Sequence, residues 1–462
     1  MVTKIKCGVE VHIQLDTKSK LFCSCPTNGK EEANTRTCEI CLGHPGSKPV
    51  LNKQAVLLAL KLAQALECKI NKEIYFSRKS YFYPDLTKNF QITQYEIPLG
   101  EKGFLELPSK NKIRINRIHV EEDPGALIHP LGLQKSKFIL IDYNRSGIPL
   151  VELVTEPDIT SADEAREFMK QLRIILEYLE IFNINGTIKA DVNISTKENN
   201  FTRVEIKNIT GFKEIERAIN YEIERQLQEG QKQQETRGWD ADKGVTYLMR
   251  VKETEADYGY IFEPDLVMIE TTELNKEVTI PELPLEKLNR FVQKYKLDRE
   301  DAKAIVSDIN LAKLFEEISK RVNPIFTAKF LRRDLVKYLE NKSLKEVILD
   351  TQHMTELAEL FCNKKITDKI AKELLEKLLK NDFSPKDYVK EKKLEIVDNV
   401  SELNKFVQQV IEENPNALED YLKGRAESLN FLVGQVMRLS QGKASPEKVK
   451  DIFKKAIFKK DL

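Results

Sequence analysis

The amino-acid sequence predicts an α+β fold, with an α+β domain over residues 1–290, a helical domain over 291–396 and a small helical tail domain over 397–462. Two observations support this division. Up to about Pro284 the chain is rich in alternating β-branched segments, glycine, proline and aromatic residues, and long Lys/Glu/Leu stretches with helical spacing follow. A length of 462 residues also exceeds what one ordinary hydrophobic core needs.

Composition narrows the class of protein. No run of 18 apolar residues occurs and a strand begins within a few residues of Met1, so we expect no membrane span, no signal peptide and a cytoplasmic location. The 74 basic and 73 acidic residues nearly cancel. Any nucleic-acid site must therefore be a local patch of charge and not a property of the whole chain.

The stretch KCGVEVHIQLD, residues 6–16, alternates between apolar and polar residues, as a half-buried β-strand does. Its apolar side chains should face the core, and Glu10, His12 and Gln14 should share the opposite face. An acid, an imidazole and an amide are an unusual set for a face that contacts only water. For any single strand, however, a solvated face is the ordinary interpretation.

Four of the seven cysteines lie in the segment CSCPTNGKEEANTRTCEIC, at Cys23, Cys25, Cys38 and Cys41. Two close pairs on either side of a loop can converge on one tetrahedral ion, because thiolates are soft ligands and each pair presents two sulfurs from one turn. The alternatives are disulfide bonds, which a cytoplasmic location disfavours, and unrelated thiols, which the clustering disfavours. The pattern predicts a structural zinc with no open coordination position.

Acidic residues gather in two later segments. RIHVEEDPG contains Glu121, Glu122 and Asp123 in a row, and Glu152 lies between apolar neighbours in NRSGIPLVELVTEPD, where an unpaired carboxylate would be costly. A hard cation such as magnesium, bound by carboxylate oxygens, accounts for this concentration of acids.

Two further strands repeat the polar face. In NGTIKADVNIS the polar residues include Lys189, Asp191 and Asn193, and in TRVEIKNIT they include Arg203. Lys79, Lys189 and Arg203 are candidates to neutralise phosphates. None of the familiar phosphate loops or hydrolase motifs is present. The residues alone therefore indicate a zinc-braced chain with a carboxylate-lined site, compatible with a magnesium nucleotide.

Helix signals follow the strands. Ser161 with Glu164 forms a capping box ahead of an apolar-periodic stretch over 168–179, and a second helix is expected over 214–228. Near the end of the chain, Pro446 takes the first position of a last helix. Candidate basic patches for a polyanion are Arg332 with Arg333 in the helical domain and, in the tail, Lys454, Lys455, Lys459 and Lys460.

Several long blocks together carry a family resemblance. They include GVEVHIQLDTKSKLF, RKSYFYPDLTKNFQITQYEIPL, RIHVEEDPGALIH, DYNRSGIPLVELVTEPDI, KADVNIS and, at the end, NFLVGQVMRLSQGKASPEKV. In order and spacing they resemble the B subunit of the aspartyl/glutamyl-tRNA amidotransferases, from about residue 6 to 458. The resemblance implies a mixed-sheet α+β cradle domain, followed by helical and tail domains that bind tRNA.

The resemblance also implies an activity and partners. The family binds Glu-tRNA(Gln) or Asp-tRNA(Asn), phosphorylates the mischarged side-chain carboxylate with ATP and lets ammonia displace the phosphate. The ammonia comes from glutamine in the glutamine amidase, or A subunit, and a small C subunit usually joins the two.

Site residues follow from the resemblance motif by motif. The magnesium and kinase site of the family corresponds to Glu10, His12, Glu122 and Glu152, the second of the two adjacent acids being the one that matches. Positions near that site correspond to Lys79, Asp191 and Asn193. The four cysteines match those members of the family that keep zinc.

Two other classes of protein remain as alternatives. One is a tRNA-binding scaffold whose kinase site has decayed, which the presence of all the acids disfavours. The other is a zinc hydrolase, which the closed set of four thiolates disfavours.

Overall fold

The computed structural model describes residues 3–132, 136–182, 186, 188–251, 259–339, 344, 347, 349–396, 400–440 and 442–458. The chain divides into two compact units, Met1–Pro284 and Leu285–Leu462. The first unit contains sheets and helices and the second is helical, which confirms the predicted α+β class. The division into three domains at residues 290 and 396 stays a prediction.

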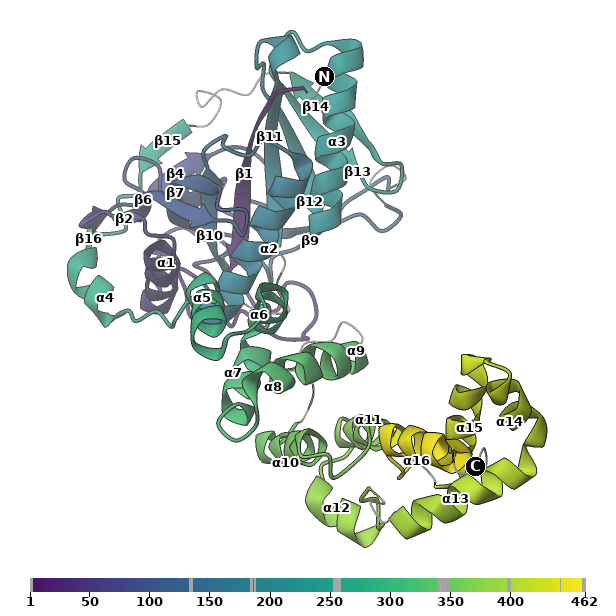
Figure 1. The fold of residues 1–462 in the computed structure, drawn as a ribbon. Helices are drawn as coiled ribbons and strands as arrows, with labels where there is room; N and C mark the ends of the chain where they lie inside the picture. The colour runs from purple at the N-terminus through teal and green to yellow at the C-terminus, as the bar shows by residue number, and fades with distance from the viewer. Residues whose placement is uncertain are drawn as a thin grey trace. The chain divides into compact units, whose positions relative to one another are not determined.

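A nine-stranded sheet organises the first unit (Figure 1). All neighbouring strands are antiparallel except β12 and β13, which are parallel. In spatial order the strands are β14 (Val245–Val251), β13 (Glu235–Asp240), β12 (Val204–Thr210), β11 (Ile188–Thr196), β1 (Ile5–Gln14), β10 (Pro149–Thr155), β7 (Lys112–Glu122), β6 (Gly100–Glu106) and β2 (Lys69–Ile70).

One face of this sheet is covered by α1 (Lys53–Ala65), α2 (Ala162–Leu179) and α3 (Phe212–Glu229). Of these helices, α3 contacts β11 and β12, and α2 contacts both α1 and α3. The apolar positions of β1 are buried against these helices, and Glu10, His12 and Gln14 of the same strand are only partly buried. The alternation of the opening strand is therefore confirmed, and one face of the sheet stays free to carry polar side chains.

Local capping explains where these helices begin. The side chain of Asn52 accepts hydrogen bonds from the N–H groups of Gln54 and Ala55 at the start of α1. Ser161 Oγ accepts from the Glu164 N–H at the start of α2, and the Glu164 carboxylate accepts from the Thr160 N–H. Both helices predicted in this unit are confirmed, and the cap signals placed the first of them well.

Shorter elements complete the first unit. Strands β15 (Gly259–Phe262), β4 (Ser77–Ser80) and β5 (Phe90–Thr93) form one small sheet, β16 (Ile269–Glu270) pairs with β3 (Glu73–Ile74), and β8 (Ala126–Ile128) pairs with β9 (Leu140–Asp142). A short 3-10 helix covers Lys197–Asn199, and α4 covers Thr271–Glu277.

The second unit is built from helices with two clusters of buried apolar residues, one from Leu288 to Val389 and one from Leu403 to Phe453. Proline follows the capping residue at the start of α8 and α12. Its elements are α5 (Pro284–Tyr295), α6 (Arg299–Val306), α7 (Ile309–Ile318), α8 (Pro324–Phe330), a π-helical turn (Leu331–Leu335), α9 (Val336–Tyr338), α10 (Thr351–Cys362), α11 (Asp368–Leu378), α12 (Pro385–Glu391), α13 (Val400–Glu413), α14 (Pro415–Leu422), α15 (Ala426–Leu439) and α16 (Pro446–Phe458).

Within the described residues, none of the helices combines the length and apolar character that crossing a bilayer requires.

A buried ion pair stabilises the packing of α3 against the edge of the sheet. Glu222, which is fully buried, accepts a hydrogen bond from Arg225 at 2.7 Å and another from Thr246 of β14 at 2.9 Å. We expect Glu222→Ala to lower the free energy of unfolding by about 3 kcal/mol, because it leaves a buried guanidinium without its main partner. Chemical denaturation measures this change. Glu224→Ala, at an exposed position of the same helix, is the control and should change stability by less than about 0.5 kcal/mol.

Candidate functional site

The polar face of the large sheet carries a row of side chains from four adjacent strands. The register pairs Lys189 of β11 with His12 of β1, His12 with Glu152 of β10, and Glu152 with His119 of β7. Directly opposed residues on neighbouring strands project from the same face of a sheet. Register alone therefore brings an amine, two imidazoles and a carboxylate into one line.

Carboxylates surround both imidazoles. The Nε2 atom of His12 lies 3.4 Å from Glu152 Oε2, 3.5 Å from Glu121 Oε1 and 3.6 Å from Glu10 Oε1. The Nε2 atom of His119 lies 3.5 Å from Glu121 Oε2 and 3.5 Å from Glu152 Oε2. We call these five side chains the carboxylate-imidazole cluster. Three acids within reach of two rings make a strong local attraction for positive charge.

The pKa shifts express the same attraction. Burial opposes the charged form of both imidazoles, but Glu152 and its neighbours outweigh it and raise the pKa of His12 to about 10 and that of His119 to about 9. The charge of Glu152, followed by burial, raises the pKa of Glu10 to about 7. Burial would raise the pKa of Glu152, but His119 and His12 hold it well below the ordinary value.

The cluster differs from the sequence expectation at one position. Glu122 does not face His12: its carboxylate lies 2.6 Å from Lys88 Nζ and accepts a hydrogen bond from the Ile92 N–H at 2.9 Å. Adjacent residues of a strand point to opposite faces, so only one of Glu121 and Glu122 can join the row that contains His119. The structure places Glu121 there. Counting alternate positions from His119 along RIHVEED would have found it.

The structure brings together three of the predicted site residues, Glu10, His12 and Glu152. Each offers one potential ligand atom, and these three atoms lie within 4.8 Å of one another. His119 was not among the predicted site residues. Its position two residues before Glu121, on the same strand face, was the signal for it.

The other predicted site residues lie on neighbouring elements. Asp191 is opposite Glu10 in the register, and Asn193 is opposite Gly8. Lys189 is exposed opposite His12. Lys79 is on β4, opposite Tyr260 of β15. Three of these four residues therefore lie on β11, beside the strand that carries Glu10 and His12, and the fourth, Lys79, lies on the small sheet that contains β4.

Arg203 lies before β12 with an exposed side chain, and its backbone carbonyl accepts a hydrogen bond from the Glu235 N–H. A second basic side chain on that strand, Lys207, forms ion pairs: its Nζ lies 3.1 Å from Asp191 and 2.9 Å from Glu205. Lys207 also interacts electrostatically with Glu10. It was not among the predicted site residues, although it shares a strand face with Glu205.

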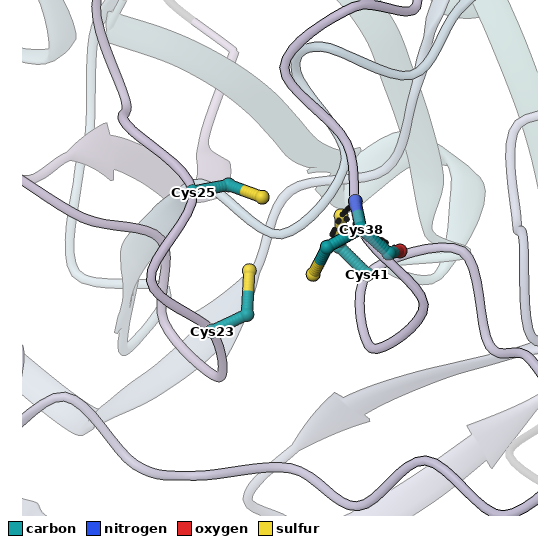
Figure 2. A group of neighbouring side chains, drawn as sticks. All are labelled: Cys23, Cys25, Cys38 and Cys41. Atoms are coloured by element: carbon teal, nitrogen blue, oxygen red, sulfur yellow. Dashed lines mark hydrogen bonds between the residues drawn. The ribbon is translucent and has the colours of Figure 1, made fainter.

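The four cysteines converge from two loops, as Figure 2 shows. Their sulfurs all lie within 4.8 Å of one another, and those of Cys38 and Cys41 are 3.9 Å apart. Four thiolates around zinc, with Zn–S distances of about 2.3 Å, have sulfurs about 3.8 Å apart, so the loops need little adjustment to bind the ion. The four thiolates fit a structural zinc and would leave no coordination position on the ion open to a substrate.

A buried lysine supports the cysteine loops. Lys20, with no exposed surface, donates hydrogen bonds to the carbonyl oxygens of Arg36 at 2.8 Å and Tyr143 at 3.3 Å, and its Nζ is 3.7 Å from Cys41 Sγ. A hydrogen bond from Cys23, helped by Lys20, lowers the pKa of Cys41 to about 5 against the effect of burial. An ammonium group here offsets part of the negative charge that four thiolates would bring.

Comparison with known proteins gives two family models that match most of the chain. The model described as the GatB/GatE catalytic domain matches residues 5–277, and the one described as the GatB domain matches residues 313–457. Both the large sheet with its polar row and the cysteine loops lie within the first match.

Curated relatives resemble the chain over nearly its whole length. An aspartyl/glutamyl-tRNA(Asn/Gln) amidotransferase B subunit of Clostridium acetobutylicum, the one numbered 2, is 43% identical over 476 residues, covering 97% of this chain and 98% of that protein. The corresponding B subunit of Methanocaldococcus jannaschii is 42% identical, covering 99% and 98%. That of Thermotoga maritima is 40% identical, covering 97% and 98%.

Proposed function

Because this chain belongs to the B-subunit family of the aspartyl/glutamyl-tRNA(Asn/Gln) amidotransferases, we propose that it converts mischarged tRNA into correctly charged tRNA by amidation. The substrate is Glu-tRNA(Gln), Asp-tRNA(Asn) or both. The side-chain carboxylate takes the γ-phosphoryl group of ATP, and ammonia then displaces phosphate to form the amide. The ammonia is released from glutamine by the amidase, or A subunit, and the small C subunit completes the assembly.

We assign the chemical step to the large sheet because that sheet bears the carboxylate-imidazole cluster. The carboxylates of Glu10, Glu121 and Glu152 with the imidazole of His12 would hold magnesium, because carboxylate oxygens are its usual protein ligands. Bound magnesium would supply positive charge next to the phosphoryl oxygens of ATP. Glu121 replaces Glu122 in this proposal because only Glu121 faces His12.

The cations of the neighbouring elements would bind phosphate groups. Lys189 continues the row beside His12, and Lys207 lies beside Asp191, across the register from Glu10. Together with Lys79 and Arg203 they would offset the charge of a nucleotide that the acids of the cluster would otherwise repel. Positioning and charge compensation of this kind account for most of the catalysis of phosphoryl transfer.

An assay of the assembled enzyme tests this function. The trimer is incubated with glutamine and each mischarged tRNA, with and without ATP, and the amidated aminoacyl group is measured. We expect product only with ATP, accompanied by release of one phosphate per amide. Binding of tRNA without any amidation would support the scaffold alternative, and product lost on zinc chelation but independent of ATP would support the hydrolase alternative.

The tail is proposed to help hold the tRNA. Lys454 and Lys455 of α16 are exposed, whereas Arg332 and Arg333 are engaged with Asp301 and Asp334 at 2.6 and 2.8 Å; Lys459 and Lys460 lie outside the described residues. We expect Lys454→Glu with Lys455→Glu to weaken tRNA binding and to reduce the slope of log affinity against log salt by about 2, because two phosphate contacts are lost. Filter binding at several salt concentrations measures both quantities.

The matched control for the tail variant is Arg332→Gln, which removes a guanidinium that an ion pair already occupies. It should leave the salt slope unchanged. If Arg332→Gln lowers the slope and the double lysine variant does not, the helical domain and not the tail provides the contacts.

A further inference from the structure

An open hollow of about 640 Å³ lies beside the hairpin that joins β6 to β7, and the turn that leads into α2 completes its lining. Its volume is that of a small-molecule site. The hollow is separate from the carboxylate-imidazole cluster, because β7 rises about 15 Å between Arg114, which lines the hollow, and His119. We propose that this hollow binds one nucleotide, with the base against Phe104 and the phosphate at Lys102 and Lys112.

The aromatic side of the hollow is positioned by the backbone. Phe104 of β6 is only partly buried, and its N–H donates a hydrogen bond to the Leu66 carbonyl at 2.9 Å. The preceding residue, Gly103, allows this close approach, since a Cβ there would clash with the Leu66 oxygen and with Cys68 Sγ. A ring whose backbone is already fixed costs little further ordering when a ligand stacks on it.

One face of the Phe104 ring is accessible to polar groups. Lys112 Nζ lies 4.0 Å from the ring centroid, and Phe104 is opposed to Arg114 in the register. Lys112 and Arg114 alternate along β7, so their side chains project from the same side of the sheet as the ring. The Lys112 side chain is 54% exposed and lies 3.8 Å from Glu106. A base that stacks on the ring can therefore displace the ammonium group at little cost.

The charges around the hollow favour a phosphate group. Asp158 and Glu164, the acids that line it, already have partners: Asp158 accepts from Arg114 at 2.6 and 2.8 Å, and Glu164 accepts from the Thr160 N–H at 2.7 Å. Lys102, in contrast, is exposed and makes no ion pair with any residue that the structure describes. An exposed ammonium group without a carboxylate partner is well suited to bind phosphate.

A nucleotide uses both features of the hollow. Its planar base can stack on an aromatic ring whichever base it is, and its phosphate can contact the ammonium groups. Inorganic phosphate would leave the ring unused, and an apolar ligand would leave the two lysines unused. The nucleotide can be an unpaired one of a bound tRNA or a free one. No residue of the carboxylate-imidazole cluster takes part, so the inference does not depend on the chemical step proposed above.

Binding measured with two probes tests the inference. AMP is titrated against the full chain by equilibrium dialysis without magnesium, and a tRNA transcript is titrated against the assembled enzyme by filter binding. Phe104→Leu should weaken at least one of these affinities by about 10-fold, because a stacking contact is lost, and Phe104→Tyr, which keeps the ring, should bind as the wild type does. A loss for AMP identifies a free nucleotide as a ligand, and a loss for the transcript identifies a nucleotide of the tRNA.

Lys102→Gln should weaken binding of the same probe and, where that probe is tRNA, reduce the slope of log affinity against log salt by about 1. Its matched control is Lys110→Gln, which should bind as the wild type does. Both lysines are exposed and have positive φ, 58° at Lys102 and 71° at Lys110, but only Lys102 lines the hollow. Neither substitution touches the core, so a folding defect does not obscure the result.

Unchanged affinity for both probes in Phe104→Leu and Lys102→Gln, or an equal loss in Lys110→Gln, would overturn the nucleotide site. Amidation assayed on the same proteins separates this inference from the proposed function. ATP-dependent amidation with unchanged affinities in the variants would refute only the hollow, and affinities that fall as expected in an enzyme that does not amidate would refute only the chemical step.

Discussion

Glu152→Gln is expected to lower the rate of ATP-dependent amidation by more than about 100-fold. The substitution keeps the size of the side chain but removes the charge that faces both His12 and His119. Without that charge, the carboxylate-imidazole cluster loses the acid that lies beside both of its rings. Single-turnover amidation by the assembled enzyme measures the change, and hydrolysis of glutamine by the amidase partner, measured in parallel, should remain detectable.

The control for this variant is Glu106→Gln, a glutamate at the end of β6 that lies 3.8 Å from Lys112. It should amidate at close to the wild-type rate. An amidation rate for Glu152→Gln within about threefold of the wild type would exclude the cluster as the chemical site. The polar row would then have only a structural role.

Cys41→Ser is expected to remove most of the bound zinc and to destabilise the first unit by at least about 2 kcal/mol, which corresponds to about 4–8 °C in unfolding temperature. Loss of one thiolate opens the site. It also leaves Lys20, fully buried, without the sulfur that lies 3.7 Å from its ammonium group. Elemental analysis and thermal unfolding of protein purified without chelators measure the two effects together.

Cys68→Ser provides the comparison for the zinc prediction, because Cys68 is partly buried and lies outside the four-cysteine cluster. It should keep the full zinc content. A wild-type protein that contains no zinc, or a Cys41→Ser variant that retains it, would contradict a four-thiolate site.

Much of the fold could be predicted from local patterns. Alternation identified the polar face of β1, and the Ser161 cap identified the start of α2, because both depend on residues a few positions apart. The four-cysteine cluster could be predicted for the same reason, because all four cysteines lie within one short segment of the chain.

The candidate site was less predictable because strand register depends on segments far apart in the sequence. The row that joins Lys189, His12, Glu152 and His119 exists only through the pairing of four strands, and no local signal fixes which residues are opposed. The choice of Glu122 over Glu121 came from motif matching, and one step along a strand changes the face. Lys207 was missed because its role depends on Asp191 of the neighbouring strand.

The position of β1 in the middle of the large sheet has a consequence for synthesis of the chain. The neighbours of β1 in the sheet are β10 and β11, which end at Thr155 and Thr196. At about 5–20 residues per second, a ribosome needs roughly 10–40 s to reach the last of these partners after β1 has been made. The cysteine loops can close within that interval, but the row around His12 cannot form. Each newly made chain can therefore bring its four cysteines together well before it completes the row of side chains around His12.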